Sequence, residues 1–114
     1  MQEEQKWYGL AVLPVYLRLS RKHLKESIEQ LDHFEACQRK PHVLNDQVMD
    51  RLITGFLAQN HSACVFEEQC KRWSLEPLTK QAAKELTELK ANVAVFRENN
   101  TQLLALVRDF KNRD

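Results

Sequence analysis

A chain of 114 residues, 43% hydrophobic and 29% charged, has the size and composition of one globular domain rather than of a disordered segment. Its formal net charge of +1 gives no overall field that would favour nucleic acid or an anionic membrane. Only two glycines and three prolines occur, and helix-forming residues dominate, so the composition favours an all-α fold.

The cysteines and the N-terminal region indicate the compartment. Cys37, Cys64 and Cys70 cannot all pair within one chain, and reduced thiols are the rule in the cytoplasm. The start of the chain lacks the basic region of a secretory signal, and no small-residue cleavage site follows the apolar stretch. The apolar stretch at residues 7–19 is interrupted by Pro14 and is too short to span a bilayer. We therefore expect a cytoplasmic protein with no membrane partner.

Residues 1–14 form an apolar N-terminal arm that contrasts with the polar remainder of the chain. The arm holds Trp7 and Tyr8, and Tyr16 follows it closely. Because proline removes a backbone donor, Pro14 predicts a turn between the arm and the first helix. Two interpretations stay open. The arm packs under the helices and closes the core, or it is exchanged between copies or lines a groove that accepts a partner helix.

The first helix is expected over about residues 15–39. At helical spacing one stripe of this segment holds Leu17, Leu24, Ile28, Leu31 and Glu35, and Phe34 extends the edge of that stripe. A second set of side chains is basic and shares an arc of about 100° on the helix. This basic stripe consists of Arg18, Arg21, Lys22 and Lys25. It either binds phosphates or an acidic partner, or is an ordinary solvated face.

The second helix is expected over about residues 45–74, after Pro41. Asn45 or Asp46 is suited to cap its free backbone N–H groups. The apolar positions recur in steps of three and four residues and comprise Met49, Leu52, Ile53, Phe56, Ala63, Phe66, Cys70 and Trp73. The polar residues 59–62 interrupt this pattern, which predicts either a kink or a polar layer.

The third helix, expected over about residues 79–112, has the clearest pattern. Thr79 is a natural N-cap. Apolar residues then follow in alternating steps of four and three, with one asparagine among them: Ala82, Leu86, Leu89, Val93, Phe96, Asn100, Leu103, Val107 and Phe110. This uninterrupted heptad seam is typical of coiled-coil-like packing against neighbouring helices.

Asn100 is the polar residue of the seam. Folding the chain about residue 76 places Asn100 near the level of Leu52 and Gln59 near Val93, so we do not expect the two amides to pair. A buried seam asparagine can set the register of a bundle by pairing with another polar group. Asn100 is therefore expected either to meet its own copy across a dimer axis or to reach water.

The spacing of the helices predicts the architecture. A short turn at residues 74–78 makes the second and third helices antiparallel neighbours. The first helix and the arm then cover one side of this hairpin. We expect a single domain over residues 1–114, an antiparallel bundle of three main helices. Because helices of this length leave apolar surface exposed, we also expect a homodimer.

Metal and enzyme chemistry have little support in the sequence. His33 and Cys37 share a helix face, as do His61 and Cys64, but the two pairs are expected to lie about 15 Å apart along the bundle. Zinc ligands lie about 2 Å from the metal, so these residues do not predict a metal site. No phosphate-binding loop, nucleophile elbow or Glu-x-x-His motif occurs. We expect no cofactor and no enzymatic activity.

The sequence thus predicts a non-enzymatic protein that acts by protein–protein association, as a self-associating adaptor or regulatory module or with another helical protein as partner. The expected association surface is apolar and consists of Trp7, Tyr8, Tyr16, Phe96, Asn100, Leu103, Leu104, Val107 and Phe110. The alternative is a regulator that binds nucleic acid through the basic stripe of the first helix, which the nearly neutral charge disfavours.

Overall fold

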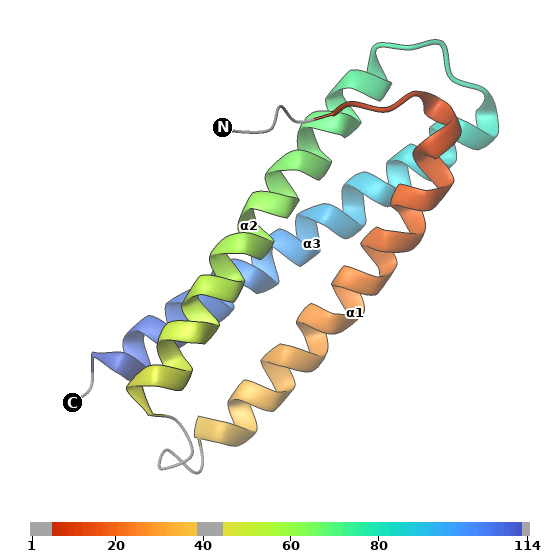
Figure 1. Ribbon diagram of the computed structural model, residues 1–114. Helices are drawn as coiled ribbons and strands as arrows, with labels where there is room; N and C mark the ends of the chain where they lie inside the picture. The colour runs from red at the N-terminus through yellow and green to blue at the C-terminus, as the bar shows by residue number, and fades with distance from the viewer. Residues whose placement is uncertain (1–5, 39–44, 113–114) are drawn as a thin grey trace.

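The computed structural model describes residues 6–38 and 45–112, and these residues form an all-α bundle of three long helices (Figure 1). A short 3₁₀ helix, η1 (Leu10–Val12), runs directly into α1 (Leu13–Gln38). The chain continues with α2 (Asp46–Ser74) and α3 (Lys80–Lys111). The all-α bundle predicted from the sequence is confirmed. None of the described helices is long and apolar enough to cross a membrane.

The starts of α2 and α3 follow from their capping residues. The Asn45 side chain accepts a hydrogen bond from the Val48 backbone nitrogen at 2.9 Å. Thr79 Oγ1 accepts one from the Ala82 nitrogen at 3.0 Å. Each side chain satisfies a backbone donor that the first helical turn leaves free, which is why the helices begin at these positions. Residues 75–79, with Pro77 among them, form the turn between α2 and α3.

The start of α1 differs from the prediction. The helix begins at Leu13, so Pro14 lies in its first turn and not in a turn before it. The first residues of a helix have no intrahelical partner for their N–H groups, and proline is tolerated there because its missing donor is not needed. The described part of the arm before η1 is therefore shorter than expected. Pro41 lies outside the described residues.

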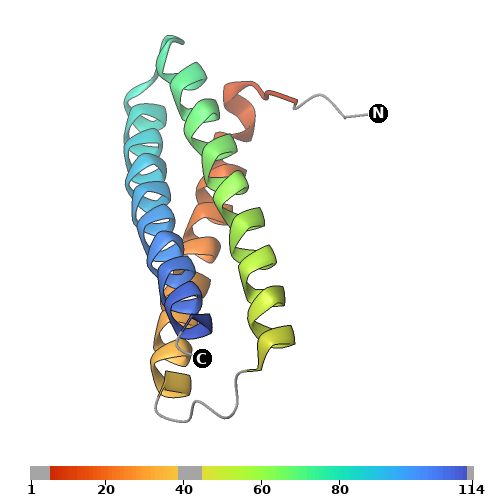
Figure 2. The same ribbon diagram turned by 90° about the vertical axis from the view of Figure 1, so that its left-hand side faces the viewer.

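α3 is the central element of the bundle. It packs along both α1 and α2, whereas α1 and α2 contact each other little (Figures 1 and 2). Hydrogen bonds between Ser20 and Asn92 and between Ser27 and Asn99 advance by seven residues in both helices, so α1 and α3 are parallel. α2 runs antiparallel to both. One side of the α1–α2 pair is thus backed by α3, and the other side faces solvent.

Two small polar residues allow α1 to approach α3 closely. Ser20 and Ser27 are 2% and 1% exposed. Asn92 Nδ2 donates to Ser20 Oγ at 3.2 Å, and Asn99 Nδ2 donates to Ser27 Oγ at 3.1 Å. Because these serines face α3, the side of α1 that is buried differs at one edge from the stripe that the sequence predicted. Ile28 consequently lies at the surface, 46% exposed, where the sequence pattern placed it in the core.

The apolar core is divided into two clusters. The cluster near the arm contains Leu13, Leu17, Phe66, Cys70, Trp73, Leu86, Leu89 and Val93. The cluster near the opposite end contains Phe34, Met49, Phe56, Leu103, Leu104 and Val107. The residues of α2 and α3 between the clusters include the amides of Asn60 and Asn100, which are hydrogen-bonded to each other. The interruption at residues 59–62 is therefore a polar layer in a continuous helix rather than a break in α2.

Candidate functional site

Most of the expected association surface lies inside a single chain. Five of its members are at most 6% exposed, and all five lie in α3: Phe96, Asn100, Leu103, Leu104 and Val107. Phe110 is partly buried, and its ring centroid lies 6.3 Å from that of Phe34. Within one chain these α3 side chains are therefore covered by α1 and α2 and are not available on the surface.

Asn100 also has a different role from either expectation. It is 0% exposed, and its Nδ2 donates to the Phe56 carbonyl at 2.8 Å and to Asn60 Oδ1 at 3.2 Å. It therefore does not reach water, and its Nδ2 finds both partners within one chain, whereas its Oδ1 is buried without a hydrogen-bond partner. Contacts between α2 and α3 centre the hairpin near residue 80 instead of 76: Asn100 with Asn60, Arg97 with Glu67 and Lys111 with Asp50. Asn100 is thereby brought to the level of Asn60 instead of Leu52.

Side chains of α2 hold the arm in place through hydrogen bonds to the backbone of Tyr8. The side chain of Gln69, 0% exposed, accepts from the Tyr8 nitrogen at 2.9 Å and donates to the Tyr8 carbonyl at 3.2 Å. Trp73 Nε1 donates to the same carbonyl at 2.9 Å. A buried glutamine thus pairs with both main-chain groups of one residue. Gln69 was missed from the sequence because polarity alone marks it as a surface residue.

Aromatic contacts complete the arm end of the bundle. The Arg72 guanidinium lies 4.4 Å from the centroid of the Trp7 ring, within the range of a cation–π contact. The Tyr16 ring makes edge contacts with Tyr8, Phe66 and Trp73, with centroids 6.0, 5.1 and 5.2 Å apart. Within one chain the arm therefore packs on the core, which is the first of its two interpretations. A single chain does not test the exchange of the arm or the binding of a partner helix.

A pocket of about 280 Å³ opens between α1 and α2, on the side away from α3. We call it the α1–α2 groove, and its lining is Tyr16, Leu19, His23, His61, Ser62, Val65 and Phe66. The His23 ring lies between α2 and α3, with centroids 5.8 Å from Phe66 and 5.4 Å from Phe96. The floor of the groove is therefore aromatic, because the α1 and α2 backbones diverge and their ring side chains meet between them.

Apolar side chains continue from the groove onto the nearby surface of the arm and α1. Leu19, which lines the groove, is 40% exposed, Val15 is 50% exposed and Tyr8 is 44% exposed. Val15 and Leu19 are four residues apart and so share one side of the helix. Single exposed apolar residues are ordinary, but a set next to an apolar groove is typical of an interaction surface.

The basic stripe of α1 lies at the surface as expected, but one of its charges is paired. Arg21 Nε and Nη2 donate to the Glu88 carboxylate at 2.6 and 2.9 Å. The hydrogen bonds and charge of Arg21 lower the pKa of Glu88, and Glu88 raises the pKa of Arg21. Arg18, Lys22 and Lys25 are exposed. This pairing withdraws part of the stripe from binding to an external anion.

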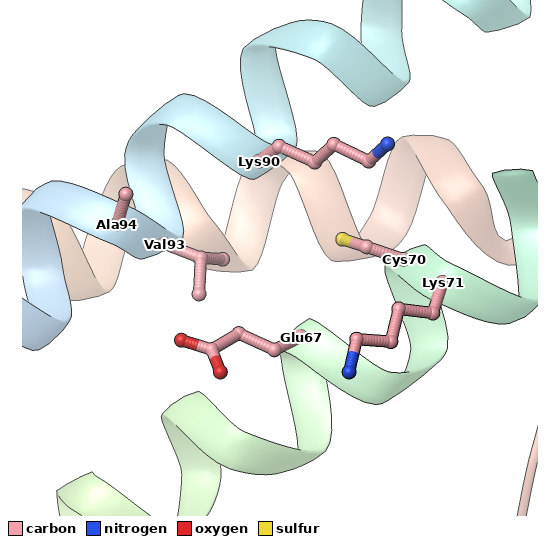
Figure 3. Close-up of a pocket in the computed structure, with 6 residues that line it drawn as sticks. All are labelled: Glu67, Cys70, Lys71, Lys90, Val93 and Ala94. Atoms are coloured by element: carbon pink, nitrogen blue, oxygen red, sulfur yellow. The ribbon is translucent and has the colours of Figure 1, made fainter.

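A second pocket of about 260 Å³ lies between α2 and α3 (Figure 3). Cys70 and Val93 form its apolar wall, and Glu67, Lys71 and Lys90 surround it. Cys70 is 3% exposed, and burial raises the pKa of its thiol to about 11 although Lys90 opposes this. A thiol that stays protonated at neutral pH is a poor nucleophile, so the structure gives Cys70 no support as a reactive residue of this pocket.

The histidines and cysteines considered for metal binding do not come together in the described part of the chain. His33 is exposed on α1, His61 and Cys64 are exposed on α2, and the side chain of Cys37 lies outside the described residues. Among residues 6–36 and 45–112, no group of three or more potential ligands could hold a metal ion. Comparisons with protein-family models, with curated proteins and with solved structures gave no match.

Proposed function

We propose that this protein is a non-enzymatic association module that binds a helix in the α1–α2 groove. The observation that carries the proposal is that the backbones of α1 and α2 lie closer to α3 than to each other, so that aromatic side chains meet between them and form the floor of an open groove. A helix laid there would complete a four-helix arrangement and cover Leu19 and Val65. Amphipathic helices bind to other proteins in apolar grooves of this kind.

The homodimer expected from the sequence remains the second candidate. Val15 and Leu19 beside the groove favour it, because the same apolar side chains from a second copy would be covered in a two-fold contact. The nucleic-acid alternative is less favoured, since Arg21 is engaged with Glu88. No described feature adds support for catalysis.

Introducing a charge at the groove tests the proposal. Leu19→Glu places a carboxylate in the groove, and Leu57→Glu is the matched control because Leu57 is similarly exposed at 47% but does not line the groove. We expect proteins that co-purify with the wild type to be lost with Leu19→Glu and kept with Leu57→Glu. Each retained partner is then rebuilt from purified components and its affinity measured by calorimetry.

Light scattering at tens of micromolar separates the two candidates. A wild-type dimer that becomes a monomer only with Leu19→Glu identifies a second copy as the occupant. Co-purifying proteins and oligomeric state that are both unaffected by Leu19→Glu would contradict a role for the groove.

A further inference from the structure

The charged side chains of α1 are segregated along the helix. Its arginines and lysines all precede its aspartate and glutamates, in the order Arg18, Arg21, Lys22, Lys25, Glu26, Glu29, Asp32 and Glu35. The sign changes between Lys25 and Glu26, at the midpoint of this 26-residue helix. α1 therefore has a basic half next to the arm and an acidic half of equal length toward Gln38.

Interactions within the chain do not explain this order. The helix dipole favours acidic side chains near the first turn and basic ones near the last, which is the reverse of the arrangement in α1. Within each half, side chains three or four residues apart carry like charges, which destabilises a helix. All eight charged side chains are exposed, and within residues 6–36 and 45–112 only Arg21 among them forms an ion pair, with Glu88. The segregation therefore favours a contact outside the chain.

Charges of both halves meet on one side of the helix, which we call the outer face of α1. It has two basic and two acidic residues around the midpoint and one exposed apolar residue toward each end, namely Lys22, Lys25, Glu26, Glu29, Val15 and Ala36. These residues lie within an arc of about 100° around the helix axis. The arc is opposite Ser20 and Ser27, which face α3. Such a face is complementary in charge to a copy of itself in the antiparallel orientation.

We infer that a second copy of this chain binds along the outer face of α1, with its own α1 antiparallel. Full overlap of the two helices about their midpoints places Lys25 opposite Glu26 of the second copy and Lys22 opposite Glu29 of the second copy. Two-fold symmetry repeats each pairing. A parallel arrangement would place like charges together, so the charges select the antiparallel one. This inference goes beyond the proposed function, since it concerns the outer face of α1 and not the α1–α2 groove.

The ends of the contact are apolar in the same register. Val15, 50% exposed, lies opposite Ala36 of the second copy at both ends, and Leu19, 40% exposed, lies beside Val15. The contact follows α1 along its whole length of about 39 Å. Because exposed ion pairs contribute little stability individually, the apolar ends supply affinity and the charged centre supplies orientation.

Reversing the charge of one half tests the inference. Lys22→Glu with Lys25→Glu makes the outer face acidic throughout, and Glu26→Lys with Glu29→Lys makes it basic throughout. We expect the wild type to be a dimer at tens of micromolar by light scattering. Each double variant alone should have a dimer Kd at least about tenfold higher, measured by sedimentation, and an equimolar mixture of the two should recover the wild-type affinity.

The orientation is tested at unchanged net charge. The variant that carries all four substitutions exchanges the basic and acidic parts of the outer face, so an antiparallel contact makes it complementary to itself but not to the wild type. We expect it to form dimers with itself and to form mixed dimers with the wild type at least about tenfold more weakly, measured by energy transfer between labelled copies. A parallel contact would favour the mixed dimers instead.

A matched control separates this contact from a general effect of charge. Lys80→Glu with Lys84→Glu makes the same change in net charge at exposed positions of α3 and should leave the dimer unchanged. Circular dichroism checks folding, and the single variants Lys22→Glu and Glu29→Lys replace a double variant that does not fold.

Three results would overturn the inference. They are a wild type that is monomeric at tens of micromolar, a dimer that the charge reversals leave unchanged, and mixed dimers of the fourfold variant with the wild type that are as stable as either parent. None of them contradicts the groove function, because Leu19→Glu tests that function through the proteins that co-purify.

Discussion

At the scale of single residues, burial separates two cysteines that look alike in the sequence. Cys64 is exposed on α2, whereas Cys70, six residues later, faces the apolar cluster near the arm. Burial raises the pKa of Cys70 from the ordinary value of 9.0 to about 11. Because the reactive form of a cysteine is its thiolate, the two side chains should differ in chemistry as well as in access.

We predict that the two thiols react with a disulfide reagent at very different rates. In a Cys37→Ser background at pH 8, Cys64 should react at once. Cys70 should react at least about tenfold more slowly, because its side chain is 3% exposed and burial raises the pKa of its thiol to about 11, which lowers its thiolate fraction. Mass spectrometry of the modified peptides measures both rates, and unfolding in urea should equalise them. Equal rates in the native protein would contradict the burial of Cys70.

The polar residues of the interior were the hardest to predict from sequence. Ser20 and Ser27 look like surface residues by polarity, and the signal that was available is their seven-residue spacing, matched by Asn92 and Asn99. Gln69 gave no comparable signal, because the apolar residues around it already explained that face of α2. A polar residue is expected at the surface only if no other helix offers it a hydrogen-bond partner. Such partners cannot be read from the sequence around the residue itself.

At the scale of elements, the arm depends on one side chain of α2. Gln69 pairs with both backbone groups of Tyr8, and without it the Tyr8 N–H loses its hydrogen-bond acceptor. Trp73 still holds the Tyr8 carbonyl. The arm is therefore attached mainly by hydrogen bonds from side chains of α2 to the main chain of Tyr8, together with the aromatic contact between Tyr8 and Tyr16.

We predict that Gln69→Leu destabilises the fold by about 1 kcal/mol, because it removes the acceptor of the part-buried Tyr8 N–H and one donor to the Tyr8 carbonyl. The arm should also open more often, so chymotrypsin should cleave after Trp7 or Tyr8 faster than in the wild type. Urea unfolding and timed proteolysis measure the two effects, with Gln102→Leu on the exposed face of α3 as the control. The proposed attachment of the arm fails if Gln69→Leu and the control behave alike.

The elements themselves followed from local patterns. The heptad seam of residues 82–110 predicted α3, and the caps Asn45 and Thr79 stand where the sequence placed them. These features are readable because caps and helical periodicity depend on neighbours within a turn or two. The start of α1 was misplaced since a proline is compatible both with a turn before a helix and with the first turn of one.

At the scale of the whole molecule, an amide layer divides the core. Val93 belongs to the cluster near the arm and Val107 to the cluster near the other end, with Asn100 and its partners between them. Four helical turns separate the two valines, about 21 Å along α3. Side chains this far apart with no shared neighbours are expected to contribute independently to stability.

We predict that Val93→Ala and Val107→Ala each destabilise the protein by about 2 kcal/mol, since each removes two buried methyl groups and leaves a small cavity. The double variant should lose the sum of the two effects to within about 0.5 kcal/mol. Urea unfolding followed by circular dichroism supplies the four free energies. A coupling above about 1 kcal/mol would show that the amide layer does not separate the clusters.

The heptad seam, the capping residues and the composition determined by themselves that this chain forms three long helices around an apolar interior. Their physical basis is local, so one sequence suffices to read it. The tertiary structure decided which faces are covered: α3 is enclosed by its own neighbours, Asn100 finds Asn60, and the groove opens where α1 and α2 diverge. Those outcomes depend on a hairpin centred about four residues beyond its expected position and on small serines that let α1 approach α3, and helical periodicity encodes neither.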